Sequence, residues 1–171
     1  MTKLFAIMDK ILKLNQKNFQ QLFTALQKDG YMTVGPVFQD GAIVYAKIDG
    51  TDELPIGWTD EQAPSTYRLV KQTKQKFFSF HAGPQSWKRF LYPPQRKLFS
   101  IKKNGKSLEI SGEQVPDIKY AFIGVRPCEL SAILIQDMVF GSDEYPDEYY
   151  KRLRENAFVV AVNCTDAGGT C

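Results

Sequence analysis

Apolar residues near the start of the chain recur at helical spacing. Asn15 is a suitable N-cap residue, and Asp29-Gly30 is a typical helix end. The pattern predicts an amphipathic helix between these positions, with one apolar face formed by Phe19, Leu22, Phe23 and Leu26.

Residues 31–116 follow a different pattern, in which apolar and polar positions alternate. Alternation around Asp40-Gly41 and around Asn104-Gly105 predicts two β-hairpins, over residues 31–48 and 97–111. Two further strands are expected at 67–72 and 76–83, and a short helix before Pro93-Pro94. Residues 49–67 have no sustained period and are rich in Pro, Gly, Asp and Thr, which predicts a long surface loop.

The pattern changes again near residue 117. Residues 118–125 form a continuous apolar run typical of a buried strand, and Pro127 then opens an apolar helix. A polar helix at 146–157 and a second apolar strand, from residue 158, complete a βαβ unit with parallel strands. The predicted fold class is α/β (α+β): an antiparallel, hairpin-rich front (about residues 12–115) joined to a βαβ part (about 117–171).

Composition narrows the functional classes. The chain has 171 residues, a length typical of one domain, and its net charge of +3 is too balanced to indicate nucleic acid or an anionic membrane as a partner. No apolar run reaches the roughly 20 residues that a membrane-spanning helix needs, and the charged N-terminal stretch is not typical of a signal peptide. We therefore expect a cytoplasmic protein without membrane insertion. Three cysteines are an odd number, which favours metal or redox chemistry over disulfides.

The cysteines follow the predicted parallel strands. Cys128 and Cys164 each come just after a strand, and such strand ends meet at the ligand-binding edge of an open α/β sheet. Gly168-Gly169 would allow Cys171 to fold back toward them. Arg126 and the start of the helix would favour ionised sulfur at this edge. Cys128, Cys164 and Cys171 are therefore the candidate metal ligands, with Arg126, Gly168 and Gly169 as supporting residues.

Three thiolates are one fewer than a closed zinc site or a 4Fe–4S cluster requires, so a fourth ligand is expected beyond Cys171. Two alternatives to a cluster remain open. In the first, the cysteines are small structural hydrophobes in a non-redox assembly module. In the second, they hold a structural zinc ion. A hydrolase or a nucleotide-binding enzyme is disfavoured, because the sequence has no nucleophile elbow, Walker A loop or dinucleotide fingerprint.

The stretches "IGVRPCELSAILIQDMVF", "YPDEYYKRLREN" and "VAVNCTDAGGTC" occur in the order of a known family. Together with "GPVFQDGAIVYAKI", "ELPIGWTDEQAPSTYRL" and "KRFLYPPQRKLF", they resemble the electron-transfer β subunit of NiFe sulfhydrogenases and the related A subunit of anaerobic sulfite reductase. The resemblance implies the N-terminal region of an iron–sulfur subunit whose ferredoxin-like 4Fe–4S region lies beyond this sequence. It implies hydrogenase or reductase subunits as partners, with no independent catalysis by this region.

Other conspicuous residues have structural interpretations. His81 is the sole histidine, and we expect it to be structural. The Gly57-Trp58 loop is a candidate for docking a partner or covering the cysteines, although a loop whose tryptophan fills the core is the favoured interpretation. Four further aromatic residues are expected in the core rather than at a cofactor: Phe77, Phe78, Phe80 and Trp87.

Overall fold

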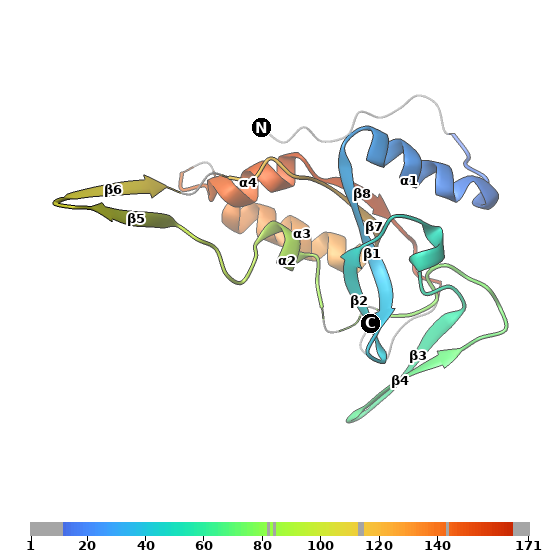
Figure 1. Ribbon diagram of the computed structural model, residues 1–171. Helices are drawn as coiled ribbons and strands as arrows, with labels where there is room; N and C mark the ends of the chain where they lie inside the picture. The colour runs from blue at the N-terminus through green and yellow to red at the C-terminus, as the bar shows by residue number, and fades with distance from the viewer. Residues whose placement is uncertain (1–11, 82, 84, 113–114, 143, 166–171) are drawn as a thin grey trace.

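A four-stranded mixed sheet forms the centre of the protein in the computed structural model, which describes residues 12–81, 83, 85–112, 115–142 and 144–165. Its order is β2-β1-β7-β8 (Figure 1). Strands β1 (Tyr31–Gln39) and β2 (Ala42–Lys47) form the predicted antiparallel hairpin. Strand β7 (Lys119–Val125) runs parallel to both β1 and β8 (Phe158–Ala161), which confirms the predicted parallel pair and joins it to the hairpin.

Helices cover both faces of this sheet (Figure 1). Helix α1 (Phe19–Lys28) packs on one face, with Phe23 and Leu26 against Ala121 and Ile123 of β7. Helices α2 (Lys88–Leu91), α3 (Pro127–Phe140) and α4 (Glu148–Glu155) pack on the other. The core on that face consists of Val34, Tyr45, Trp87, Leu91, Phe122, Val125, Ile133, Tyr150 and Leu153. Because β7 is buried on both faces, it is the continuous apolar run in the sequence.

The first helix begins and ends close to the predicted positions. Asn15 caps a 3₁₀ turn, η1 (Gln16–Asn18), and its side chain accepts a hydrogen bond from the Lys17 backbone N–H at 3.1 Å. Helix α1 continues from this turn, and Gly30 closes it with a φ of +83°, a conformation that glycine adopts without strain. None of the helices in the described ranges is long and apolar enough to span a bilayer.

Two further hairpins lie outside the central sheet (Figure 1). Strands β5 (Phe99–Asn104) and β6 (Ser107–Gly112) form the second predicted hairpin. Strands β3 (Trp58–Ala63) and β4 (Thr66–Lys71) form another, so the prediction of a surface loop throughout 49–67 is wrong for its second half. The first half does contain irregular chain and one 3₁₀ turn, η2 (Thr51–Glu53). The alternation in β3 was hidden because the charged Asp60 is its buried residue.

The strand predicted at 76–83 is also wrong, since no described residue of this range belongs to a strand. Side chains bind two of its backbone carbonyls. The Ser79 carbonyl accepts from Thr59 Oγ1 at 2.8 Å, and the Phe80 carbonyl accepts from the Arg126 guanidinium. Residues 77–81 therefore act as an irregular connector between the β3–β4 hairpin and the central sheet.

Candidate functional site

The candidate site lies where β7 and β8 end, at the carboxyl edge of the sheet. Val125 is fully buried, and its carbonyl accepts a hydrogen bond from the Val162 N–H at 2.9 Å, which holds the two strand ends together. Cys128 follows Val125 by three residues, and Cys164 follows Ala161 by three. Both cysteines are exposed, free thiols. The chain therefore brings two cysteine-bearing segments to one edge, as open α/β sheets do for their ligands.

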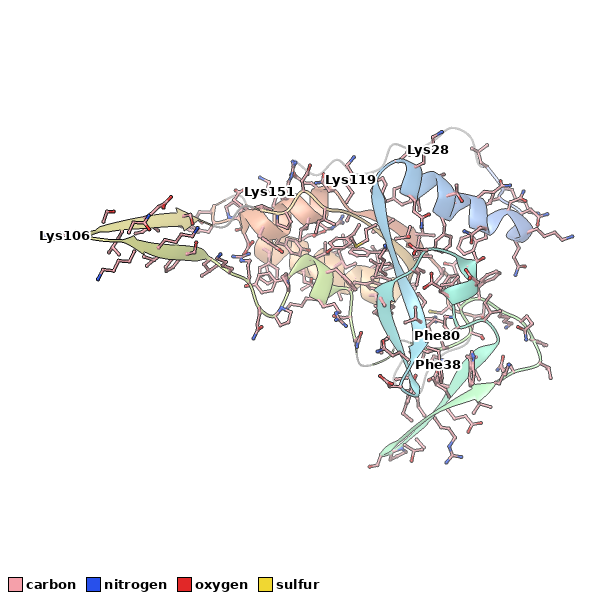
Figure 2. All side chains as sticks on the ribbon, in the orientation of Figure 1. Lys28, Phe38, Phe80, Lys106, Lys119 and Lys151 are labelled. Carbon is pink, nitrogen blue, oxygen red and sulfur yellow. The ribbon has the colours of Figure 1, made fainter. Side chains whose placement is uncertain are left out.

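Arg126 connects these two segments. It precedes the first residue of α3, and its Nη1 donates to the Sγ of Cys164 at 3.3 Å. Its Nη2 donates to the carbonyls of Phe80 and, at 3.4 Å, Phe78. The guanidinium carbon also lies 5.0 Å from the centre of the Phe80 ring, a cation–π arrangement. Figure 2 shows Phe80 at the end of the sheet where β1 turns into β2.

Among the described residues, the charge of Arg126 has no directly paired carboxylate. The residue is only 4% exposed, yet within the described ranges it forms no ion pair with an acidic side chain. Its Nε is buried without a hydrogen-bond partner there. A buried cation is costly unless an anion compensates it. The sulfur of Cys164 is a direct contact, so an anionic sulfur ligand at this edge fits the donor set.

A buried pair of hydrogen-bonded side chains, Tyr45 and Glu129, stabilises the start of α3. Glu129 accepts a hydrogen bond from the Arg126 backbone N–H at 2.9 Å and another from the Tyr45 hydroxyl. Burial, followed by the nearby Glu129 carboxylate, raises the pKa of Tyr45. Sequence analysis missed this pair. A glutamate three residues after a helix-cap position is the capping-box signal that could have found Glu129, whereas nothing in the sequence marks Tyr45.

Replacing Tyr45 by phenylalanine should change how stability depends on alkaline pH. Because the pKa of Tyr45 is raised in the folded state, its hydroxyl ionises first in the unfolded chain, above about pH 10. The free energy of unfolding of the natural protein should therefore fall as pH rises above 10. In Tyr45→Phe this decline should be shallower, by up to about 1.4 kcal/mol per pH unit.

Urea unfolding at a series of pH values between 8 and 11 would measure this difference. Tyr145→Phe is the matched control, since Tyr145 is 81% exposed. At pH 8, Tyr45→Phe should itself be less stable by about 1–3 kcal/mol, because Glu129 loses a buried donor. Equal alkaline slopes in the two variants would contradict this assignment.

Cys128 faces a different environment from Cys164. It lines a cavity of about 280 Å³ between α3 and the residues around α2, together with Trp87, Lys88, Glu129 and Gln136. Within the described residues, the indole Nε1 of Trp87 and the Oε1 of Gln136 are buried without partners. The wall of this cavity is therefore partly polar.

The complete predicted ligand set extends past the described part of the chain. Cys171, Gly168 and Gly169 all lie outside the described residues. Among the residues that are described, no group of three His, Cys, Asp or Glu side chains is arranged to hold a metal ion. Cys128, Cys164 and Cys171 as a set of metal ligands therefore stay a prediction.

The Gly57-Trp58 segment also lies near the carboxyl edge. Gly57 has a φ of +74° and starts the β3–β4 hairpin, and the ring of Trp58 stacks on that of Phe38 with centroids 4.9 Å apart. Phe38 lies near the end of β1 and is 46% exposed, while Trp58 is half-buried. Trp58 is thus not a core residue, and the favoured interpretation of a core-filling tryptophan is wrong. The core tryptophan is Trp87.

His81 forms a pair with the buried Asp60. Its backbone N–H donates to Asp60 Oδ1 at 2.5 Å, and its Nδ1 lies 3.0 Å from the same oxygen. Gln62 donates to the other carboxylate oxygen at 2.7 Å. Asp60 thereby fastens residue 81 of the connector to β3. The histidine has this structural contact, which agrees with its expected role.

The chain is 28% identical over 155 residues to the sulfhydrogenase 2 subunit beta of Pyrococcus furiosus. The chain is a distant relative of that sulfhydrogenase subunit. The similarity covers 91% of this chain but only 38% of the Pyrococcus protein. It confirms the resemblance inferred from the motifs. No protein-family profile and no solved structure matches the chain.

Proposed function

We propose that this sulfhydrogenase-related chain is the N-terminal region of an electron-transfer subunit, and that its carboxyl edge holds a 4Fe–4S cluster. Cys128, Cys164 and Cys171 would be three of the cluster ligands, and a fourth would come from outside the described residues. Hydrogenase or reductase subunits of the same complex would be its partners. Such a cluster takes up and releases one electron at a time, and no bond-making chemistry is assigned to this region.

The contact between Arg126 and Cys164 is the observation that carries this proposal. A guanidinium at 3.3 Å from the sulfur can donate a hydrogen bond to a ligating thiolate. Hydrogen bonds and positive charge at ligand sulfurs favour the reduced, more negative state of a cluster. Arg126 would therefore raise the reduction potential of the site, while Phe78 and Phe80 carbonyls orient its guanidinium.

Iron loading of the cysteine variants tests the proposal. The chain would be purified without oxygen and incubated with ferrous iron, sulfide and a small thiol able to act as a fourth ligand. We expect about four irons and four acid-labile sulfides per chain, with broad visible absorption. Cys128→Ser and Cys164→Ser should each lose most of this iron, because serine does not replace a thiolate ligand efficiently.

Ser131→Ala is the matched control, since Ser131 is exposed one turn after Cys128 on α3. It should load iron like the natural chain. Absence of iron from a chain with unchanged far-ultraviolet circular dichroism would refute the cluster and favour the non-redox assembly module. Zinc without sulfide would instead indicate the structural zinc site, and the absorption of a cobalt-substituted sample would identify its tetrahedral sulfur ligands.

A further inference from the structure

The β5–β6 hairpin forms an arm that extends away from the rest of the protein (Figure 1). Its two strands pair only with each other, and Figure 2 shows Lys106 at its tip. The register places Ile101 opposite Ile110 and Lys103 opposite Leu108. Because side chains alternate along a strand, these residues share one face with Phe99. The opposite face is polar, and there Ser100 bonds Ser111 at 2.7 Å.

The apolar face of the arm is open to solvent. Four large side chains on it are between 54% and 68% exposed: Phe99, Ile101, Leu108 and Ile110. A two-stranded hairpin is marginally stable alone in water, and an exposed apolar ribbon promotes association. In the described part of the chain, no second layer packs on this face. The arm therefore presents an apolar surface that no other part of the described chain covers.

A second exposed apolar surface lies on α3. Leu134, Ile135, Met138 and Val139 are 50–71% exposed, and their spacing places them along one side of the helix. Ile133 of the same helix faces the core, so this outer stripe is not required for packing within the chain. The arm extends away from the body (Figure 1).

Charge distinguishes these two surfaces from each other. The arm carries Lys102, Lys103 and Lys106 against one acidic residue, Glu109. The region that follows α3 carries the exposed Glu144 and Glu148. Glu144 lies four residues after the end of α3, and Glu148 is the first residue of α4. A basic apolar arm and an apolar helix followed by these acidic residues are complementary in both charge and hydrophobicity.

We propose that this chain forms a two-fold dimer in which the arm of each copy packs on α3 of the other. Such a dimer would contain two equivalent contacts between an arm and α3, because an isologous interface uses the same two patches from each copy. The apolar surfaces of both copies would then be covered. Lys103, which shares the apolar face, and Lys106 at the tip of the arm would approach Glu144, which follows α3 of the partner copy. The proposal is independent of whether the cysteines bind a cluster.

Analytical ultracentrifugation of two single variants, at neighbouring positions on opposite faces of the arm, tests the dimer. The natural chain should sediment as a dimer at micromolar concentration. Ile101→Asp places a charge on the apolar face and should weaken dimerisation by about 100-fold or more, because burying an unpaired carboxylate is strongly unfavourable. Ser100→Asp is the matched control, since it makes the same change one residue earlier on the polar face, and should remain dimeric. A monomeric natural chain, or equal behaviour of the two variants, would overturn the proposal.

Crosslinking tests the same contact without relying on a destabilised variant. A photoreactive benzoylphenylalanine at Leu108 would be activated in a mixture of isotopically heavy and light chains. We expect crosslinks between heavy and light chains that end on residues 134–139. Crosslinks confined to one chain, or crosslinks between chains that end elsewhere, would refute the proposed packing.

Discussion

Replacing Gly124 by alanine should lower the free energy of unfolding by about 2–5 kcal/mol. Gly124 has a φ of +92°, a conformation that residues with a Cβ rarely adopt. A Cβ at this position would lie 2.5 Å from Cε1 of Phe78, so the ring would have to move. Strain and overpacking therefore act together at one residue of the most buried strand. Urea unfolding followed by circular dichroism measures the loss.

Gly112→Ala is the matched control for that change. Gly112 is the last residue of β6, where an added Cβ would have nothing within 4 Å, and its φ is not in the left-handed region. Its stability should change by less than about 1 kcal/mol. If both alanine variants lost the same stability, the contact of Phe78 with β7 would not be the cause. Since Phe78 also offers its carbonyl to Arg126, Gly124→Ala should in addition disturb the cysteine edge.

Trp87→Ala should be destabilising by about 3–5 kcal/mol, the range for removing a large buried aromatic residue. Trp87 is only 1% exposed. It stacks on Tyr45 with ring centroids 4.0 Å apart and lies 4.9 Å from Phe122. Its loss would remove the ring against which Tyr45 rests, and Tyr45 in turn donates to Glu129 at the start of α3.

Trp58→Ala provides the comparison, because these are the two tryptophans of the chain. Trp58 is half-buried and stacks on the exposed Phe38, so its removal should reduce stability by only about 1 kcal/mol. Both variants should be followed by circular dichroism in urea, since each removes a fluorophore. A larger loss for Trp58→Ala than for Trp87→Ala would contradict the assignment of the core.

Local patterns predicted the elements whose burial follows a simple period. The helix from Phe19 to Lys28, the hairpin at Asp40-Gly41 and the apolar strand before Arg126 are all of this kind. The β3 strand was missed because its inward side chain is an aspartate, which becomes favourable only through His81 and Gln62. Sequence periodicity does not contain that partner. A buried charge is explained only by the tertiary contacts that compensate it.

The strand predicted at 76–83 is wrong for the opposite reason: its sequence has strand-like spacing, but its described residues have no strand partner. Phe78 and Phe80 are two residues apart, as on one face of a strand, but Phe80 is buried in an irregular connector whose carbonyls bind Thr59 and Arg126. For the site, strand order alone was enough to place Cys128 and Cys164 at the same edge. The position of Arg126 between Cys164 and the connector required contacts between residues far apart in the sequence, which a local pattern does not specify.

Because β8 is short, we expect the cysteine edge to open locally while the rest of the protein stays folded. Strand β8 has four residues, pairs with one neighbour and forms an edge of the sheet, whereas β7 is buried between two strands. Short edge strands open locally at a small fraction of the global unfolding free energy. Cys164, three residues past β8, would separate from Arg126 in such an opening while β1 and β7 stay paired. Amide exchange of residues 158–162 would thus report how often the Cys164 thiol separates from Arg126, independently of the rate at which the whole protein unfolds.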